Sequence, residues 1–238
     1  MMGQHKTNSA TLRLLISMNY LAHLYLSGKS EKILVGNFIG DYVKGNQYKN
    51  YADEIAQGIL LHRYIDSFTD KHGKCREAKQ PFRADFGLYS GIVVDVIFDH
   101  FLARNWHNYS TVSLREFTKW SHAVLLAHYQ FLPARVQRFL PFLIQSRRLE
   151  SYASVEGIAR VIEIMGKHSS LPSKPQAVKA VLLKNYKSLE ENFEAFMPDL
   201  IQYVTHAHRI SLDFPITSSV QDTVLGQHFE VGFLKKET

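Results

Sequence analysis

The sequence predicts an all-α, single-domain helical bundle, and three observations carry this prediction. Apolar residues recur at three- and four-residue intervals over most of the stretch from Leu12 to Arg209, which is the spacing of one helix face. Strict alternation, the pattern of a half-buried strand, is rare, and short breaks containing Gly, Pro or Asn separate the apolar segments. With 238 residues, 45% of them hydrophobic, the chain can bury one sizeable core, so one domain is expected.

The periodic segments give the expected helices in chain order. They cover residues 20–26, 30–43, 53–69, 75–82, 89–105, 113–128, 134–148, 154–167 and 176–208. Pro141 is expected to bend or split the seventh of them, because proline lacks the N–H group that a helix interior uses. Residues 171–175 include two prolines and predict a helix-free linker before the last long helix.

Both ends of the chain are interpreted as lying outside this bundle. Met18 directly precedes the first strong motif, so residues 1–17 are interpreted as an N-terminal extension and residues 18–209 as the helical domain. Periodicity fades in residues 210–238, which predicts a partly ordered tail. The apolar stretch 12–26 is interrupted by Asn19 and His23, has no small-residue cleavage site and is too short to span a bilayer. We therefore expect a core helix there, no membrane span and a cytoplasmic location.

The charge balance and the single cysteine limit the classes of partner and site. The chain carries 28 Lys and Arg against 22 Asp and Glu, a net charge of +6, which favours an anionic partner such as nucleic acid, a phospholipid surface or an acidic protein. Cys75 is the only cysteine, so a disulfide within the chain and a Cys-based metal site are both excluded. We interpret Cys75 as an incidental surface residue.

Several basic side chains are expected on the surface. Most are interpreted as solvated, with residues 135–148 as a candidate strip for binding a partner. The basic residues in question are Arg135, Arg138, Arg147, Arg148, Lys184 and Lys187.

The first chemical pattern lies in the predicted helix 53–69. His62 and Asp66 are four residues apart, and Asp70 follows four residues later, so a helix would place them along one stripe. Apolar residues such as Ile59 and Ile65 flank the stripe. A carboxylate that borders buried surface is costly unless it is paired or bound to a metal.

A second pattern lies in the predicted helix 89–105. Asp95 and Asp99 are four residues apart, His100 is adjacent, and the run from Ile92 to Leu102 is otherwise almost wholly apolar. Two carboxylates on one face of a core helix repel each other. A divalent cation suits such a set of oxygen and imidazole groups.

His23 and Asp41 complete the candidate set as single polar residues in apolar settings. Taken one at a time, each of these residues is more simply explained as structural: a hydrogen-bonded core histidine, a turn cap, or an i,i+4 pair that contributes a few tenths of a kcal/mol. Taken together, two such pairs on separate apolar helices with His23 and Asp41 favour one shared cation. The other histidines lack such neighbours and are interpreted as structural or surface residues.

Three other chemistries lack their motifs. The chain has no Gly-x-x-x-x-Gly-Lys-Ser/Thr loop and no strand-associated Gly-x-Gly-x-x-Gly, which leaves ATP and dinucleotide binding without support. It has no Gly-x-Ser-x-Gly elbow for a serine hydrolase. No nucleic-acid-binding motif is present either, so we expect no nucleic-acid partner.

Four segments, in this order, carry a family resemblance. They are Met18-Asn19-Tyr20-Leu21-Ala22-His23-Leu24, Gly36-Asn37 with Gly40-Asp41-Tyr42-Val43-Lys44-Gly45, Gly58 with His62-Arg63, Ile65-Asp66 and Thr69-Asp70, and Asp95 with Asp99-His100-Phe101-Leu102 and Trp106. Together they resemble the acyl carrier protein phosphodiesterase family. The specific match runs from Met18 to Trp106, and the remainder shares only helical character.

The resemblance implies an HD-domain-like, all-helical and manganese-dependent enzyme, with Fe²⁺ or Mg²⁺ as alternative cations. It implies release of 4′-phosphopantetheine from a serine of holo-acyl carrier protein, an acidic protein substrate. The residues it points to as a metal centre are His23, Asp41, His62, Asp66, Asp95, Asp99 and His100. The chain departs from HD enzymes proper because it has no contiguous His-Asp dipeptide; Asp99-His100 is the reverse order.

On this hypothesis, His62, Asp66, Asp95 and Asp99 hold the metal with help from His23 or Asp41. His100 or His23 protonates the leaving serine oxygen, and Arg63 or Lys44 binds a phosphate oxygen. One alternative keeps the metal site but acts on a nucleotide or another small phosphodiester. A second alternative is a non-catalytic helical protein that binds an acidic partner.

Overall fold

The computed structural model describes residues 20–212, and within that range the chain is helical and contains no strand. The all-α prediction is confirmed. The α-helices are α2 Tyr20–Tyr25, α3 Glu31–Ile39, α4 Asp53–Lys71, α5 Gly73–Lys79, α6 Arg83–Phe86, α7 Ser90–Arg104, α8 Leu114–Ala127, α9 Ala134–Gln145, α10 Arg148–Ser151, α11 Val155–His168, α12 Pro175–Lys184 and α13 Tyr186–Ala207. Short 3₁₀ helices join them: η1 Gly40–Tyr42, η2 Gly45–Asn50, η3 Gln80–Phe82, η4 Gly87–Tyr89, η5 Trp106–Asn108 and η6 Tyr129–Phe131.

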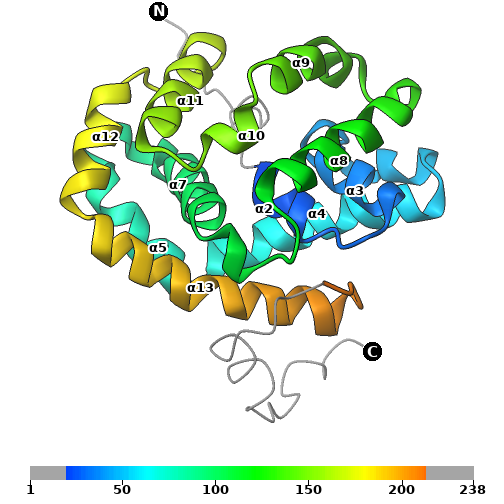
Figure 1. Cartoon of the computed structure of the whole chain (residues 1–238), viewed down its shortest axis with the longest axis horizontal. Coiled ribbons are helices and arrows are strands. Elements are labelled where there is room, and N and C mark those ends of the chain that lie inside the picture. Colours follow the sequence, from blue (N-terminus) through cyan, green and yellow to red (C-terminus); the bar gives the residue numbers. More distant parts are fainter. Residues whose placement is uncertain (1–19, 213–238) are drawn as a thin grey trace, which may run out of the picture.

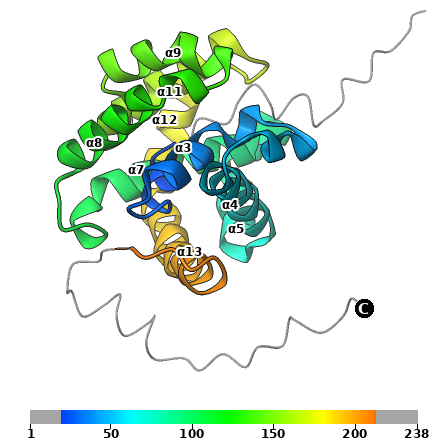
Figure 2. The same cartoon turned by 90° about the vertical axis from the view of Figure 1, so that its right-hand side faces the viewer.

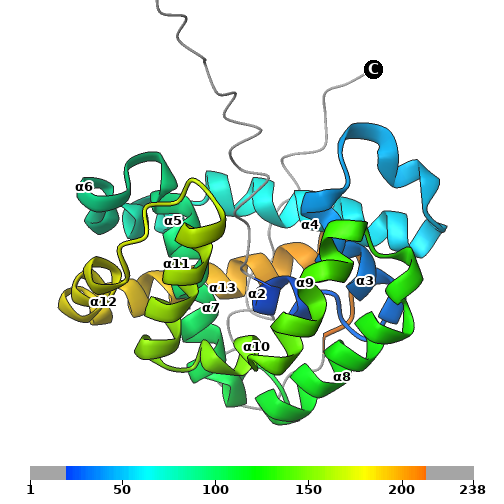
Figure 3. The same ribbon diagram turned by 90° about the horizontal axis from the view of Figure 1, so that it is seen from above.

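The helices surround the short α2, which lies in the middle of the molecule (Figure 3). Helices α3 and α4 pack along each other on one side, and α13 runs beneath α4, α5 and α7 (Figure 1). Helices α8, α9 and α11 lie on the opposite side from α4 and α5 (Figure 2). One continuous cluster of buried apolar side chains runs from α2 to α13, so the site helices α2, α3, α4 and α7 share a core.

Side-chain caps start several helices where the sequence offers Ser. The hydroxyl oxygen of Ser30 accepts a hydrogen bond from the N–H of Ile33 at the start of α3. Ser113 and Glu116 form a reciprocal capping box at the start of α8. Ser154 accepts from the N–H of Gly157 at the start of α11. Each cap satisfies one of the N–H groups that the first turn of a helix leaves without a partner.

Two predicted helix boundaries are wrong. Helix α3 ends at Ile39 and not at Val43, and the chain tightens there into η1. The single helix expected over residues 176–208 is two helices, α12 and α13, that meet at Asn185. The Asn185 amide donates to the carbonyl of Val181, as does its own backbone N–H. A side chain that competes in this way for helix carbonyls favours a break.

Pro141 does not split α9, which runs unbroken from Ala134 to Gln145. Its missing N–H would leave the carbonyl of Gln137, four residues earlier, without its helical partner. The hydroxyl of Tyr129 donates a hydrogen bond to that carbonyl at 3.2 Å. The break comes later, at Arg147, whose φ of 47° places it in the left-handed region.

Within residues 20–212, one stretch is apolar and long enough to be compared with a membrane span. It covers Gly73–Arg104, and its most apolar window has a mean hydropathy of 1.5. The structure divides this stretch into α5, η3, α6, η4 and α7, and 67% of that window is buried inside the protein. Burial among the other helices explains its composition as that of core helices.

The expectations for Cys75, for the two ends of the chain and for the similarity to HD enzymes have different outcomes. Cys75 is fully buried, which contradicts the surface interpretation, and burial raises the pKa of its thiol to about 12. The thiol is therefore a poor nucleophile. The expected N-terminal extension, the Met18-Asn19 start of the first motif and residues 213–238 of the expected tail lie outside the described residues. The similarity to HD enzymes stays a prediction.

Candidate metal centre

Four of the predicted site residues come together from three segments of the chain. His23 lies on α2, Asp41 on η1, and His62 and Asp66 lie one turn apart on α4. The Nε2 atom of His62 is 3.1 Å from Asp41 Oδ1 and 3.4 Å from Asp66 Oδ2. The Nε2 atom of His23 is 3.3 Å from Asp66 Oδ1. One ligand atom from each of His23, His62 and Asp66 lies within 4.8 Å of the others, as ligands of one ion do.

The two imidazoles are held by Asn37, a residue of α3 that the sequence analysis did not assign to the site. The Nδ1 atom of His62 is 2.8 Å from the backbone carbonyl of Asn37. The Nδ1 atom of His23 is 2.8 Å from the side-chain oxygen of Asn37. The Asn37 amide nitrogen donates to the His23 carbonyl and to Ser27, which fixes the amide orientation. The sequence feature that could have identified Asn37 as a site residue is its polar side chain in an apolar stretch, between Val35 and Phe38.

These hydrogen bonds determine the tautomer of both histidines. Because each acceptor is a carbonyl oxygen, each Nδ1 carries the proton, and the neutral ring leaves its lone pair on Nε2. The Nε2 atoms of His23 and His62 and the Oδ2 atom of Asp41 are buried, and the described residues offer them no hydrogen bond. Buried polar atoms without partners are rare. A carbonyl that accepts a hydrogen bond from Nδ1 is the usual arrangement for histidines that bind a metal through Nε2, so these residues fit a divalent cation.

Glycine makes this close approach possible. A Cβ atom on Gly40 would lie 2.3 Å from the Cγ atom of His62, well inside van der Waals contact. The rings of His23 and His62 stack with centroids 4.1 Å apart. Any side chain at position 40 would displace the His62 ring and separate its Nε2 atom from Asp41.

The electrostatics of the group favour a positive charge between the carboxylates. Burial lowers the pKa of His62, but the charges of Asp41 and Asp66 outweigh this effect and hold the pKa well above its usual value. Burial raises the pKa of Asp66, but His62 and His23 outweigh it and hold that pKa below its usual range. A bound divalent cation would supply the same compensation as a proton on the imidazole.

The group opens into a cleft of about 580 Å³. Asp41 and Asp66 line one part of it, and the Asp66 side chain is 43% exposed there. Positive charge comes from two side chains that the sequence analysis did not single out, Lys79 and Arg83. Leu88, which is 93% exposed, lies at the same cleft. The cleft therefore combines a cation-binding end with basic and apolar walls.

Asp95 also lines this cleft, although it is not in the group of close ligand atoms. Burial and the charge of Asp66 raise the pKa of Asp95 to about 8, and Lys79 opposes the rise. The carboxyl group is thus largely protonated at neutral pH in the metal-free protein. Its placement fits a proton donor facing the cleft.

Asp99 and His100 have other contacts. The Asp99 carboxylate is fully buried and accepts hydrogen bonds from the N–H groups of Leu21 at 3.0 Å and Ala22 at 2.9 Å, so it caps the start of α2. The Nδ1 atom of His100 lies 2.7 Å from the carbonyl of Tyr152, and its Nε2 lies 2.9 Å from the Tyr186 hydroxyl. The structure does not bring either residue into the group around His62.

Arg63 and Lys44 do not line the cleft among the described residues. The Arg63 guanidinium donates to the carbonyl of Val43 at 2.8 Å and lies 5.4 Å from the Tyr48 ring centroid. It therefore ties the segment after η1 to α4. Lys44 is exposed at the start of η2, which leaves Lys79 and Arg83 as the basic residues facing the cleft.

Stability should fall with pH in the metal-free protein. Burial raises the pKa of Asp99 to about 7, although the N–H groups of Ala22 and Leu21 oppose the rise, and the pKa of Asp95 is about 8. Between about pH 4 and pH 8 the folded state therefore binds more protons than the unfolded state, whose Asp pKa is about 3.9, so raising the pH removes stability. We expect Tm of the chelator-treated protein to fall by several degrees over this range.

This pH dependence can be measured by thermal unfolding at fixed ionic strength. Asp95→Asn should flatten the profile, and Asp53→Asn, at an exposed carboxylate, should leave it unchanged. Added divalent cation should raise Tm most at the alkaline end. A metal-free profile that rises from pH 5 to pH 8 would contradict the assignment of raised pKa values.

Comparison with known proteins shows which family this chain resembles. Residues 18–200 match the sequence profile of the family described as acyl carrier protein phosphodiesterase. A protein of that name from Yersinia pestis is 34% identical over 190 residues, which cover 79% of this chain and 98% of the relative. One from Yersinia enterocolitica is 35% identical over 77% of this chain and 96% of the relative. One from Serratia proteamaculans is 33% identical over 78% and 96%. No solved structure is detectably similar.

Proposed function

The chain belongs to the acyl carrier protein phosphodiesterase family, and we propose that it hydrolyses the phosphodiester between 4′-phosphopantetheine and the serine of holo-acyl carrier protein. Its relatives are named acyl carrier protein phosphodiesterase, and the similarity spans nearly their whole length. The observation that carries the proposal is the pair of buried Nε2 atoms on His23 and His62, which face the carboxylates of Asp41 and Asp66 at 3.1–3.4 Å beside a cleft.

The proposed cofactor is a divalent cation, with Mn²⁺ as first choice and Fe²⁺ or Mg²⁺ as alternatives. His23 and His62 would hold it through Nε2, and Asp66 and Asp41 would add carboxylate oxygens. When bound, such a cation supplies Lewis acidity and lowers the pKa of a water toward ~7. Two nitrogens with two carboxylates are a mixed donor set that suits Mn²⁺ and Fe²⁺ better than the all-oxygen set typical of Mg²⁺.

The surrounding residues divide the remaining tasks. Asn37 keeps both imidazoles oriented with Nε2 toward Asp66. Lys79, which pairs with Asp70 at 3.5 Å, and Arg83 place positive charge in the cleft, where a phosphodiester oxygen would need it. Asp95, which lines the cleft and whose pKa burial raises in the metal-free protein, takes the place of His100 as the candidate donor of a proton to the leaving serine oxygen. The net charge of +6 would speed encounter with an acidic carrier protein.

The proposal is tested by incubating the metal-stripped protein with holo-acyl carrier protein, with and without Mn²⁺, and following the mass of the carrier. Loss of the phosphopantetheine mass only when Mn²⁺ is present is the expected result. A panel of cyclic and linear small phosphodiesters is assayed in parallel. Hydrolysis of the panel without the carrier would favour the small-phosphodiester alternative. No hydrolysis together with no metal binding would favour the non-catalytic binding protein.

Removing the Asn37 side chain should weaken metal binding without removing any ligand. In Asn37→Ala the Nδ1 atom of His23 loses its carbonyl partner, so its tautomer and ring orientation are no longer fixed. We expect Mn²⁺ affinity to fall about 10–100-fold, as it does when the hydrogen-bond partner of a metal-binding histidine is removed. Isothermal titration measures this directly. Asn46→Ala, at an exposed position on η2, is the matched control and should bind Mn²⁺ as the parent does.

A further inference from the structure

Helix α9 carries a basic outer face. Its inner face packs into the core through Val136, Leu140 and Leu143, and its outer face carries Arg135 and Arg138, which are both exposed. Neither arginine has an ion pair or a hydrogen bond within residues 20–212. The helix contains no acidic residue, so nothing on α9 itself balances these two charges.

The basic strip predicted over residues 135–148 is shorter in the structure than in the sequence. Arg148 is only 3% exposed, which contradicts the solvated side chain expected there. The left-handed conformation of Arg147 turns the chain after α9 and carries Arg148 into the protein. Arg147 stays outside and pairs with Glu150. The positive charge that a partner could reach on this strip therefore lies on α9.

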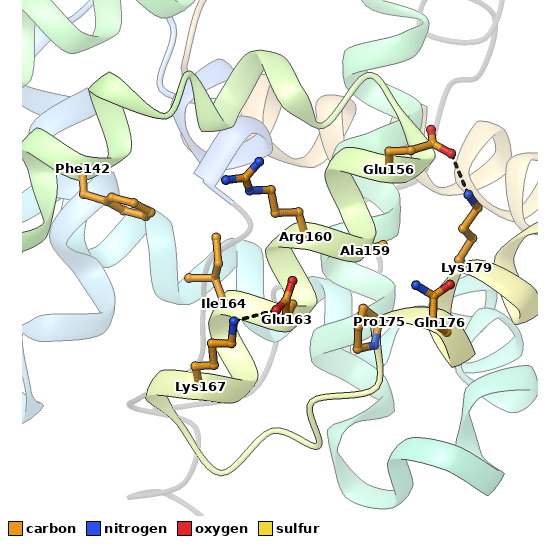
Figure 4. A pocket seen from close by; sticks show the side chains of 10 residues that line it. All are labelled: Phe142, Glu156, Ala159, Arg160, Glu163, Ile164, Lys167, Pro175, Gln176 and Lys179. Atoms are coloured by element: carbon orange, nitrogen blue, oxygen red, sulfur yellow. Dashed lines mark hydrogen bonds and ion pairs between the residues drawn. The ribbon is translucent and has the colours of Figure 1, made fainter.

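An exposed aromatic side chain continues this face. Phe142 lies four residues after Arg138, so the two side chains share one side of α9, and Phe142 is 49% exposed. Phe142 also lines a cavity of about 590 Å³ between α9, α11 and α12 (Figure 4). Ile164 and Pro175 line the same cavity. The basic face of α9 therefore borders a cavity with apolar walls.

The far wall of this cavity adds a third positive charge. Its two glutamates are each paired with a lysine, Glu156 with Lys179 at 2.7 Å and Glu163 with Lys167 at 2.6 Å. Arg160, which also lines the cavity, is exposed and has no ion pair or hydrogen bond within the described residues. In Figure 4 its guanidinium points toward the side where Phe142 lies and away from the two glutamates. The unpaired charge of α11 thus faces α9 across the cavity.

Helix α9 packs against the segments that build the metal centre. On its inner side, the ring centroid of Phe139 lies 6.0 Å from that of Tyr42 and 6.2 Å from that of Phe38. Tyr42 follows Asp41 in η1, and Phe38 follows Asn37 in α3. A protein bound to the outer face of α9 would therefore be held close to the metal centre. A substrate whose scissile bond is on its own serine requires such closeness.

We refer to four side chains around this cavity as the docking face: Arg135, Arg138, Phe142 and Arg160. We propose that the docking face binds an acidic, amphipathic helix of the carrier protein, an inference that rests on the proposed function for the identity of the partner. The carboxylates of such a helix would pair with the three arginines, and its apolar side would cover Phe142.

The composition of the docking face favours a protein partner. Arginine and aromatic side chains are enriched at protein interfaces. An amphipathic helix supplies carboxylates and apolar side chains together, whereas a nucleic-acid backbone supplies the charge alone. The net charge of +6 adds long-range attraction to an acidic protein.

Reversing both charges on α9 should weaken the use of the carrier protein without changing the chemical step. We expect Arg135→Glu combined with Arg138→Glu to raise KM for holo-acyl carrier protein at least about tenfold, because like charges then face each other. Neither residue contacts the metal centre, so kcat and Mn²⁺ content should stay as in the parent. The rate of loss of the phosphopantetheine mass is followed over a range of carrier concentrations.

Binding is measured separately from hydrolysis with apo-acyl carrier protein, which has no phosphodiester to cleave. Isothermal titration into the Mn²⁺-loaded full chain should show the same loss of affinity in the double variant, and the parent's affinity should fall as salt is added. Lys184→Glu combined with Lys187→Glu, at exposed positions on α12 and α13, makes the same change in net charge and should bind nearly as the parent does.

Phe142→Ala tests the apolar part of the docking face and leaves the arginines in place. We expect the affinity for apo-acyl carrier protein to fall about tenfold, as it does when an aromatic side chain at the centre of an interface is truncated. Leu183→Ala, at a 54% exposed leucine on α12, is the matched control and should bind as the parent does.

The outcomes separate the docking face from the proposed hydrolysis. If the parent hydrolyses the holo-carrier and the α9 double variant keeps the parental KM and Kd, the docking face is wrong and the hydrolysis stands. Equal losses in the two double variants would show an effect of net charge alone and would also overturn it. If the α9 double variant loses binding only to phosphatidylglycerol vesicles, the face binds lipid instead. A parent that neither binds nor hydrolyses the carrier would overturn both proposals.

Discussion

His62→Gln should abolish metal-dependent hydrolysis while leaving the helical bundle folded. The Nε2 atom of His62 is the point at which Asp41 and Asp66 meet, at 3.1 and 3.4 Å. Glutamine has a similar volume but offers an amide, a far weaker ligand than a neutral imidazole for these cations. A bound Lewis acid lowers the activation free energy by several kcal/mol, and ~4 kcal/mol corresponds to ~10³ in rate. We therefore expect kcat/KM to fall at least about 10³-fold.

The comparison needs three measurements on the same preparation: far-UV circular dichroism, metal content and the rate of loss of the phosphopantetheine mass. His107→Gln, at an exposed histidine after α7, is the matched control and should be indistinguishable from the parent. A folded His62→Gln protein with parental metal content and rate would remove His62 from the metal centre. Retained metal content with lost activity would instead limit its role to the reaction.

Gly36→Ala should cause a large loss of stability. A Cβ atom at Gly36 would lie 2.1 Å from the carbonyl oxygen of Ile55 and 2.9 Å from the Cα atom of Gly58. These neighbours are backbone atoms of α4 and cannot rotate away, so α3 and α4 must separate. Overpacking typically costs up to about 3 kcal/mol, and for a chain of this size we expect Tm to fall by about 6–12 °C.

Activity should fall together with stability in this variant, because α3 carries Asn37 and α4 carries His62. The Asn37 carbonyl lies 2.8 Å from His62 Nδ1 only while the two helices touch. Gly58→Ala should behave alike, since its Cβ would lie 2.3 Å from the Ile33 carbonyl oxygen. Gly73→Ala is the control: nothing lies within 4 Å of that Cβ, so stability should change by no more than about 1 kcal/mol, in the stabilising direction. An unaltered Tm in Gly36→Ala would contradict the backbone contact.

The residue pattern within one helix predicted that His62 and Asp66 lie side by side, and the structure places them so. His62 and Asp66 face the same way because residues four apart on a helix always share a face. The same rule was applied to Asp95 and Asp99 on α7, yet Asp99 caps α2 and Asp95 lines the cleft. Spacing fixes the direction of a side chain relative to its own helix. It does not fix which neighbouring helix lies in that direction.

The predicted helix boundaries and the predicted exposure of Arg148 were wrong for similar reasons. The break at Asn185 and the continuation of α9 through Pro141 both depend on hydrogen bonds that involve one side chain, of Asn185 and of Tyr129. Arg148 looks like any surface arginine in the sequence, and only the turn at Arg147 carries it inside. Single contacts decide such features, and the spacing of apolar residues along the sequence does not predict single contacts.

By itself, the sequence determined that the chain is all-helical and which family it resembles. It also grouped seven polar residues, of which the structure brings four together, His23, Asp41, His62 and Asp66. The helical character follows from local periodicity, and the grouping follows from residue types that are costly to bury without a partner. The resemblance rests on four motifs in a fixed order. The tertiary structure alone decided that Asn37 orients both imidazoles, that His100 belongs to the core and that Lys79 and Arg83 face the cleft. Each of these depends on how α2, α3, α4 and α7 pack, because contacts between helices distant in sequence are set by the shapes of their buried faces and not by the spacing within any one of them.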